Sequence, residues 1–170
     1  MIAQVSGVKS QEASKLVHVG YVGESVENIS ENYQNLVHQK MLSLVNQNFY
    51  EFYSPEDLSK SHLKHLDKIL LNKEDSLSND LSNLAKAANL DYIFVTVLNN
   101  ISDDPKRVML KGEVLRYQAN NNELYRYEML SYAEDINLHI QAIKKEMIDT
   151  IPHSVHTIGR KRTYILAGIA

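Results

Sequence analysis

The segment Tyr92–Leu98 is apolar on both of the faces that a strand presents. Side chains alternate along a strand, so two sets would face opposite ways: Ile93, Val95 and Val97 on one side, and Tyr92, Phe94 and Leu98 on the other, with Thr96 as the one polar residue. A strand of this kind belongs in the middle of a sheet that is covered on both faces. The segment therefore predicts an α/β domain in which helices pack on a sheet.

The chain before this segment alternates between strand and helix signals. In order, they predict a strand over 16–22, a connection over 23–28, a helix capped by Ser30, a short strand over 49–53, a helix that starts at Ser54-Pro55, and a helix over 77–88. Successive β-α-β units favour parallel neighbours in one sheet. We therefore expect the first half of the chain to supply parallel strands.

A long hairpin is predicted after the central strand. Arg107–Tyr117 and Leu124–Ser131 read as its strands, because Ala119–Asn122 between them suits a tight turn. Apolar residues at helical spacing then predict a closing helix over 135–151. A hairpin is antiparallel, so the fold class is a single α/β domain with a mixed parallel and antiparallel sheet.

Length and composition bound the domain organisation. The 170 residues suit one domain, with 1–14 as a flexible N-terminal segment, 15–152 as the domain and 153–170 as a tail. A net charge of -3 argues against a dedicated nucleic-acid binder, which usually has a basic face. The absence of cysteine leaves no thiol for a disulfide, a zinc-thiolate site or a lipoprotein anchor in these residues.

The two ends of the chain carry the localisation signals. The start lacks the basic-then-apolar pattern of a signal peptide, so we expect either a cytoplasmic protein or one whose presequence has been removed. Near the other end, Arg160–Arg162 precedes the uncharged run Tyr164–Ala170. This run is shorter than the roughly 20 residues that a bilayer span needs. It fits either the start of a span that continues past Ala170, with membrane contact through Arg160–Ala170, or a terminal strand or tail.

Few residues carry a catalytic or metal-binding pattern. The pairs His62/His65 and His153/His156 have a spacing at which two ligands share a helix face, but neither pair has an evident third ligand. Asp103 and Asp104 could act as carboxylate ligands or a base, although acids beside a proline are typical of turns. The glycine loops of nucleotide sites and the serine elbow of hydrolases are absent. We therefore expect no catalytic residue, metal or cofactor.

The hairpin carries a concentration of tyrosine and arginine. These candidate interface residues are Arg116, Tyr117, Tyr125, Arg126, Tyr127 and Tyr132. They fit cross-strand pairs on a half-solvated sheet face, anchors of a protein interface, or a stacking platform for bases. The acidic total charge disfavours nucleic acid. We therefore predict protein partners or self-association through Arg107–Ser131, together with the closing helix.

The helix end Leu84–Ala88, the sequence Asn89-Leu90-Asp91-Tyr92-Ile93, the following hairpin and the closing helix resemble one known family. It is the α/β domain shared by the TolB amino-terminal region, the curli secretion protein CsgG and the penicillin-binding-protein activator LpoB. The chain departs from that family by having Thr96-Val97 where a glycine is usual. The resemblance implies a non-enzymatic module of the bacterial envelope that binds proteins.

The resemblance thus implies an assembly module of a bacterial cell-envelope or secretion-type machine, in the periplasm. Two alternatives stay open. One is a membrane-tethered cytoplasmic interaction domain, because basic residues that flank a span favour the cytoplasmic side. The other is a metal-dependent hydrolase that uses His62, His65 and Asp103/Asp104.

Overall fold

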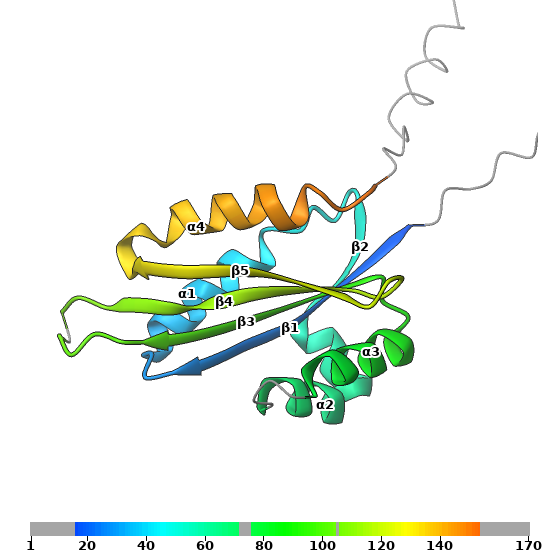
Figure 1. Cartoon of the computed structure of the whole chain (residues 1–170), viewed down its shortest axis with the longest axis horizontal. Coiled ribbons are helices and arrows are strands. Elements are labelled where there is room, and N and C mark those ends of the chain that lie inside the picture. The colour runs from blue at the N-terminus through cyan, green and yellow to red at the C-terminus, as the bar shows by residue number, and fades with distance from the viewer. Residues whose placement is uncertain (1–15, 72–75, 105, 154–170) are drawn as a thin grey trace, which may run out of the picture.

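A computed structural model describes residues 16–71, 76–104 and 106–153 of the chain. In chain order the elements are β1 (Val17–Glu27), α1 (Glu31–Leu42), β2 (Tyr50–Tyr53), α2 (Pro55–Leu71), α3 (Leu77–Ala88), β3 (Tyr92–Asn100), β4 (Met109–Gln118), β5 (Glu123–Tyr132), η1 (Ala133–Asp135), α4 (Ile136–Ile143) and η2 (Lys144–Ile148) (Figure 1). The predicted N-terminal segment 1–14 and the run Arg160–Ala170 lie outside the described residues. None of the helices in the described part is long and apolar enough to cross a bilayer.

The five strands form one mixed sheet in the order β2-β1-β3-β4-β5. Strand β1 is parallel to both β2 and β3, whereas β4 is antiparallel to β3 and to β5. The prediction of a single α/β domain with a mixed sheet is therefore confirmed. Strand β3 is the middle strand, as its two apolar faces require.

Each face of the sheet has its own hydrophobic core. Helices α1 and α4 cover the face to which Phe94 points, and α2 and α3 cover the face to which Val95 points. Both side chains are almost fully buried. Figure 1 shows α4 on one side of the sheet and the α2–α3 pair on the other. The two-sided burial of β3 thus fixes the layered architecture.

Strand β1 differs from its prediction. Residues 23–28 were expected to form a connection, but the strand runs on to Glu27 and pairs with β3 along this length. The pairing register shifts between Tyr21 and Glu24, and Gly23 lies at φ +120°. A glycine tolerates this backbone, so the strand accommodates a bulge without ending.

The junction between α3 and β3 is fixed by local backbone geometry. Asn89 adopts the left-handed conformation that ends many helices, and the Leu90 amide donates to the Ala85 carbonyl (2.9 Å). The Asp91 carboxylate then accepts a 2.9 Å hydrogen bond from the His18 amide of β1. These contacts place the start of β3 directly beside β1.

We predict that Val95→Asp lowers the free energy of unfolding by several kcal/mol, because it buries an unpaired charge between β3 and the α2–α3 layer. Val97→Asp is the matched control, since Val97 lies on the same face of the same strand but is 37% exposed. Chemical denaturation followed by circular dichroism measures both. Equal losses for the two variants would contradict the central position of Val95.

Candidate functional site

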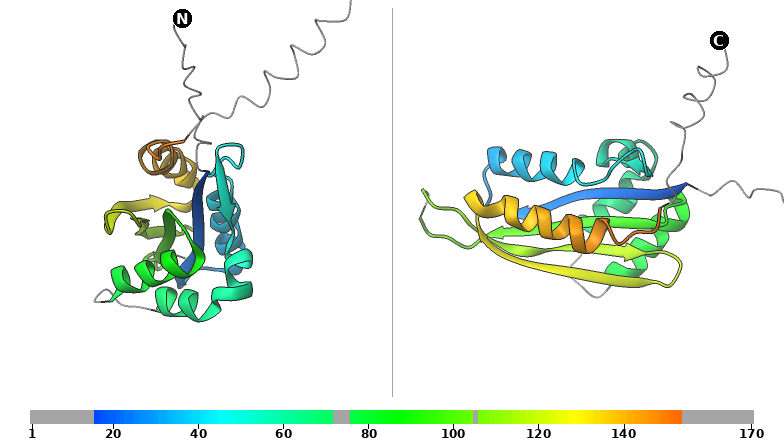
Figure 2. Two further views of the ribbon diagram at one scale, coloured as in Figure 1. Left: turned by 90° about the vertical axis from the view of Figure 1, so that its right-hand side faces the viewer. Right: turned by 90° about the horizontal axis from the view of Figure 1, so that it is seen from above.

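Strand β5 forms one edge of the sheet. It is ten residues long and its one strand neighbour is β4. Figure 2 shows β5 at the border of the domain in both views, with no other described element alongside its outer edge. The opposite edge is formed by β2, which has four residues. The long hairpin edge is therefore the larger surface at which another strand can add.

The exposed residues of the hairpin lie on two faces. Tyr125 and Tyr127 pair with β4 residues whose side chains point toward α4, whereas Arg126, Glu128 and Leu130 belong to the opposite face. Tyr125 is 42% exposed and Leu130 is 62% exposed. The candidate interface is thus an edge with an aromatic side and a mixed charged and apolar side.

Two of the predicted interface residues are buried inside the domain. Arg116 is 7% exposed, and its Nη1 donates to the Met147 carbonyl oxygen and to Thr150 Oγ1, both at 2.7 Å. A cation at the C-terminal end of a helix stabilises its free carbonyl groups, so Arg116 ties η2 to the sheet. Tyr117 is also buried and donates to Asn122 in the hairpin turn (2.6 Å). Neither side chain is available for a partner.

Tyr127 and Tyr132 are half-buried and make contacts within the chain. The Tyr127 hydroxyl lies 3.1 Å from Nδ1 of His139 on α4, and burial raises the pKa of Tyr127 above its usual range. The Arg107 guanidinium lies 3.8 Å from the centre of the Tyr132 ring. The remaining members of the predicted set, Tyr125 and Arg126, are the exposed ones.

On the face of the hairpin that carries Arg126 and Glu128, one glutamate has a cation partner within the described chain and a second glutamate does not. Glu113 and Glu128 lie directly opposite each other on β4 and β5. Arg126 donates from Nη1 to both carboxylate oxygens of Glu113, at 2.8 and 2.9 Å. Within the described part of the chain, Glu128 has no cation within ion-pair distance. Like charges in this position disfavour the pairing, so a cation supplied from outside would favour it.

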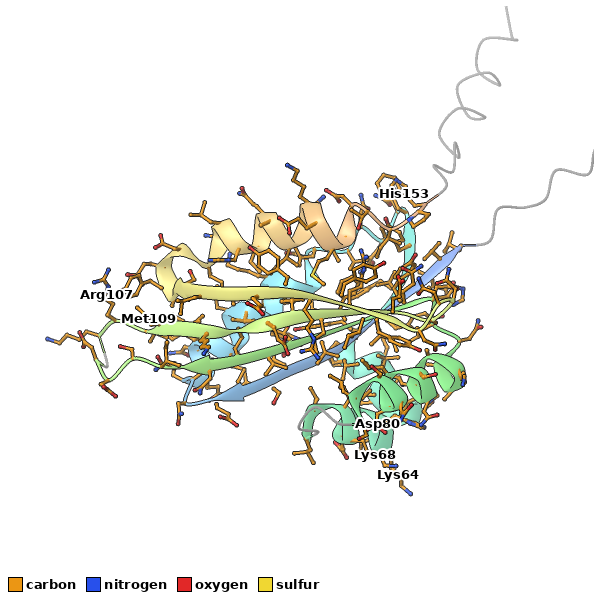
Figure 3. All side chains as sticks on the ribbon, in the orientation of Figure 1. Lys64, Lys68, Asp80, Arg107, Met109 and His153 are labelled. Carbon is orange, nitrogen blue, oxygen red and sulfur yellow. The ribbon has the colours of Figure 1, made fainter. Side chains whose placement is uncertain are left out.

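The histidines and aspartates are not brought together. His62 and His65 lie on α2, at and after a kink, whereas Asp103 and Asp104 lie in the β3–β4 loop. Figure 3 labels Lys64 of α2 and Arg107 of the β3–β4 loop, and these two residues lie in different parts of the domain. Among residues 16–71, 76–104 and 106–153, no three His, Asp or Glu side chains could hold a metal ion.

His153, labelled in Figure 3, packs as a structural residue. Its ring stacks on Phe49 with the ring centres 4.6 Å apart, and its Nδ1 lies 3.1 Å from the Tyr50 hydroxyl. His156, the second member of the predicted pair, lies outside the described residues. The described half of this pair therefore anchors the chain after Pro152 to the β2 edge.

A buried polar cluster was missed by the sequence analysis. The Tyr21 hydroxyl donates to Glu24 Oε1 (2.6 Å) and lies 3.0 Å from Thr96 Oγ1, and Nδ1 of His38 lies 3.1 Å from both Glu24 oxygens. The Glu24 side chain is only 6% exposed. Burial, followed by the charge of Glu24, raises the pKa of Tyr21 well above its ordinary value. Glu24 sits in the segment that was predicted to be a connection, so no sequence signal marked it as interior.

No protein-family model matches the sequence, and no match was found among curated proteins. Among solved structures, the chain is similar to the LpoB C-terminal domain from Salmonella enterica, with 12% identity, coverage of 71% of this chain and 86% of that one, and a TM-score of 0.38. LpoB is one of the proteins that the sequence resemblance names.

Two further solved structures are similar. For the lipoprotein GNA1162 from Neisseria meningitidis, identity is 7%, coverage is 79% of this chain and 99% of that one, and the TM-score is 0.48. For the PelC dodecamer from Paraburkholderia phytofirmans, identity is 7%, coverage is 76% of this chain and 84% of that one, and the TM-score is 0.36. At these scores, the description of the fold rests on the strands and helices of this chain.

We predict that the free energy of unfolding falls less steeply at alkaline pH in Tyr21→Phe than in the wild type. Because the pKa of Tyr21 is raised in the folded state, the unfolded chain ionises first as the pH rises through about 10. The unfolding free energy of the wild type then falls by up to about 1.4 kcal/mol per pH unit for this group, and the variant lacks this contribution. Urea denaturation between pH 8 and roughly 11 measures it. Parallel curves for the two proteins above pH 10 would contradict the assignment.

We also predict that the protein binds no stoichiometric zinc at His62 and His65, because two ligands without a third hold the metal weakly. Elemental analysis of untagged protein, dialysed against excess zinc and then against buffer, tests this. A molar equivalent that is lost in a His62→Ala/His65→Ala variant would overturn it and would revive the hydrolase alternative.

Proposed function

We propose that this domain is a non-enzymatic protein-binding module of a bacterial cell-envelope or secretion-type machine, and that it binds through the β4–β5 hairpin and the flanking helix α4. The observation that carries the proposal is the open outer edge of β5. An edge strand presents unpaired backbone N–H and C=O groups along its length, and another polypeptide strand satisfies them.

The side chains around this edge suit a protein partner. Tyr125 presents an aromatic surface beside the Arg116 guanidinium, which lies 4.3 Å from the centre of its ring. Arg116 is itself held by η2, so Tyr125 rests on a fixed support. A large ring that is already ordered loses little conformational entropy on binding, which is one reason why tyrosine is frequent at interfaces.

The sequence resemblance around Asn89-Leu90-Asp91-Tyr92-Ile93 supports the proposed envelope location. The periplasm is the compartment we propose, and the basic and apolar residues Arg160–Ala170 are the proposed membrane contact. The resemblance to proteins that act in the envelope supports the compartment, and the attraction of basic residues to anionic lipid headgroups supports the contact.

Site-specific photo-cross-linking in cells tests the proposed surface. A benzoylphenylalanine placed at Tyr125 is expected to yield adducts with an envelope protein or with a second copy of the chain. The matched control is the same residue at Leu63, which is 55% exposed on α2, away from the hairpin. In a separate binding measurement without the cross-linker, such as a pull-down or sedimentation, Tyr125→Ala should weaken the association by more than about 1 kcal/mol without changing the circular dichroism spectrum.

Equal adduct yields at the two positions, or none at Tyr125, would contradict the surface. Adducts that contain only cytoplasmic proteins would contradict the compartment while leaving the surface in place.

A further inference from the structure

The direction of each backbone group on β5 follows from the pairings at the ends of the strands. The Ala133 amide donates to the Val108 carbonyl (2.9 Å), which continues the β4–β5 register by one pair. In an antiparallel ladder, hydrogen-bonded and non-hydrogen-bonded pairs alternate. The odd-numbered residues of β5 therefore bond to β4, and the even-numbered residues turn their N–H and C=O groups outward.

The neighbouring ladder gives the same result independently. The Ala119 amide donates to the Asp91 carbonyl and the Ile101 amide to the Met109 carbonyl, both at 2.9 Å. Both bonds fall on the β3–β4 register, so odd-numbered residues of β4 bond to β3 and even-numbered ones to β5. The outward groups on β5 thus belong to Leu124, Arg126, Glu128 and Leu130, and to Tyr132 at the end of the strand.

Leu124, Arg126, Glu128 and Leu130 are complementary to the same strand read in the opposite direction, because leucine then meets leucine and arginine meets glutamate. From Leu124 to Leu130 the strand reads Leu-Tyr-Arg-Tyr-Glu-Met-Leu, with Tyr127 at its centre. Antiparallel pairing of this strand with a second copy of itself, centred on Tyr127, sets Arg126 opposite Glu128 and Leu124 opposite Leu130. Each of these pairs occurs twice because the arrangement is two-fold symmetric.

We propose that two copies of this chain associate edge to edge through β5, in the register centred on Tyr127, and form one continuous sheet. This inference rests on the proposed function, because it names the partner of the same hairpin surface. Leu124, Arg126, Glu128 and Leu130 all form hydrogen-bonded pairs in this register, and each pair exchanges two backbone hydrogen bonds.

The side chains complete the match. Glu128, which has no cation partner in its own described chain and faces Glu113, gains Arg126 of the second copy. Leu130, which is 62% exposed, is covered by Leu124 of the second copy. The two copies of Tyr127 meet as a non-hydrogen-bonded pair, in which side chains approach most closely.

The charges also exclude the neighbouring registers. A slip of two residues in one direction sets Arg126 opposite Arg126, and a slip in the other direction sets Glu128 opposite Glu128. A slip of one residue would place an outward residue opposite an inward one and would lose the backbone hydrogen bonds. Only the register centred on Tyr127 joins opposite charges, so the charges carry the specificity of this contact.

A charge-complementation experiment tests the register. Arg126→Glu and Glu128→Lys each create two like-charge contacts between identical copies, and each should weaken the dimer by about tenfold or more. A mixture of the two variants restores opposite charges at both contacts, so it should form a heterodimer with affinity close to that of the wild type. Sedimentation velocity over roughly 1 to 100 µM, where a weak dimer dissociates, measures each sample. Lys64→Glu on α2 is the control and should dimerise normally.

A second variant covers the case in which Arg126→Glu does not fold. In the doubly substituted Arg126→Glu/Glu128→Lys chain, the introduced lysine lies opposite Glu113 and takes over the role of Arg126 within the chain. This variant should dimerise with itself, whereas Glu128→Lys alone should not.

Three results would overturn the inference: a wild-type chain that stays monomeric, a dimer that neither single substitution weakens, or single variants that remain monomeric when mixed. None of these results by itself contradicts the proposed function, because adducts between position 125 and another envelope protein would still support a hairpin that binds a different partner. If those adducts were also absent, both the β5 dimer and the proposed binding function of the hairpin would be contradicted.

Discussion

Strand β3 is apolar on both faces, and the rest of the structure depends on covering both of them. Ile93 and Val95 pack against the α2–α3 pair, while Phe94 and Leu98 pack against the layer that contains α1 and α4. A buried strand also needs hydrogen-bonding neighbours on both sides, because unpaired backbone groups are costly away from water. Strand β1 supplies them in parallel and β4 in the antiparallel direction.

Because the inner strands are paired on both sides, the unpaired backbone N–H and C=O groups of the sheet lie on its two edge strands. On one side the edge is the four-residue β2, and on the other it is the ten-residue β5. Arg116 connects this second edge to the interior, since it reaches from β4 to the end of η2 and supports the ring of Tyr125. The outermost strand is therefore held in a fixed shape, and a rigid edge is better prepared for pairing than a mobile one.

How far the sequence predicts this structure depends on the range of the interactions involved. Strand β3, helix α3 and the hairpin are determined by periodicity and turn residues, which are local, and they were predicted within a few residues of their observed ends. The extension of β1 past Gly23 depends on pairing with β3, some seventy residues later in the chain, as does the contact between Tyr21 and Thr96. Local pattern cannot report such contacts.

In the candidate interface, too, local sequence patterns predicted some features, whereas others depend on contacts between residues far apart in the chain. The concentration of tyrosine and arginine on the hairpin predicted an interface there, but the sequence did not show that α4 and η2 return over the hairpin. That return buries Arg116 and half-buries Tyr127, which leaves only part of the Tyr127 side chain on the free surface. What remains exposed is the edge itself, whose even-numbered residues could be identified only from the hydrogen-bond pattern at the strand ends.

The most direct test of the account is therefore amide hydrogen exchange along β5, measured by NMR at low and high protein concentration. At low concentration, the amides of Tyr125, Tyr127 and Met129 should be protected by β4, whereas those of Leu124, Arg126, Glu128 and Leu130 should exchange rapidly. At high concentration, the even-numbered amides should become protected as well. Even-numbered amides that exchange rapidly at every concentration, or a protection pattern without this alternation, would contradict the assignment of β5 as an open edge that pairs with a second strand.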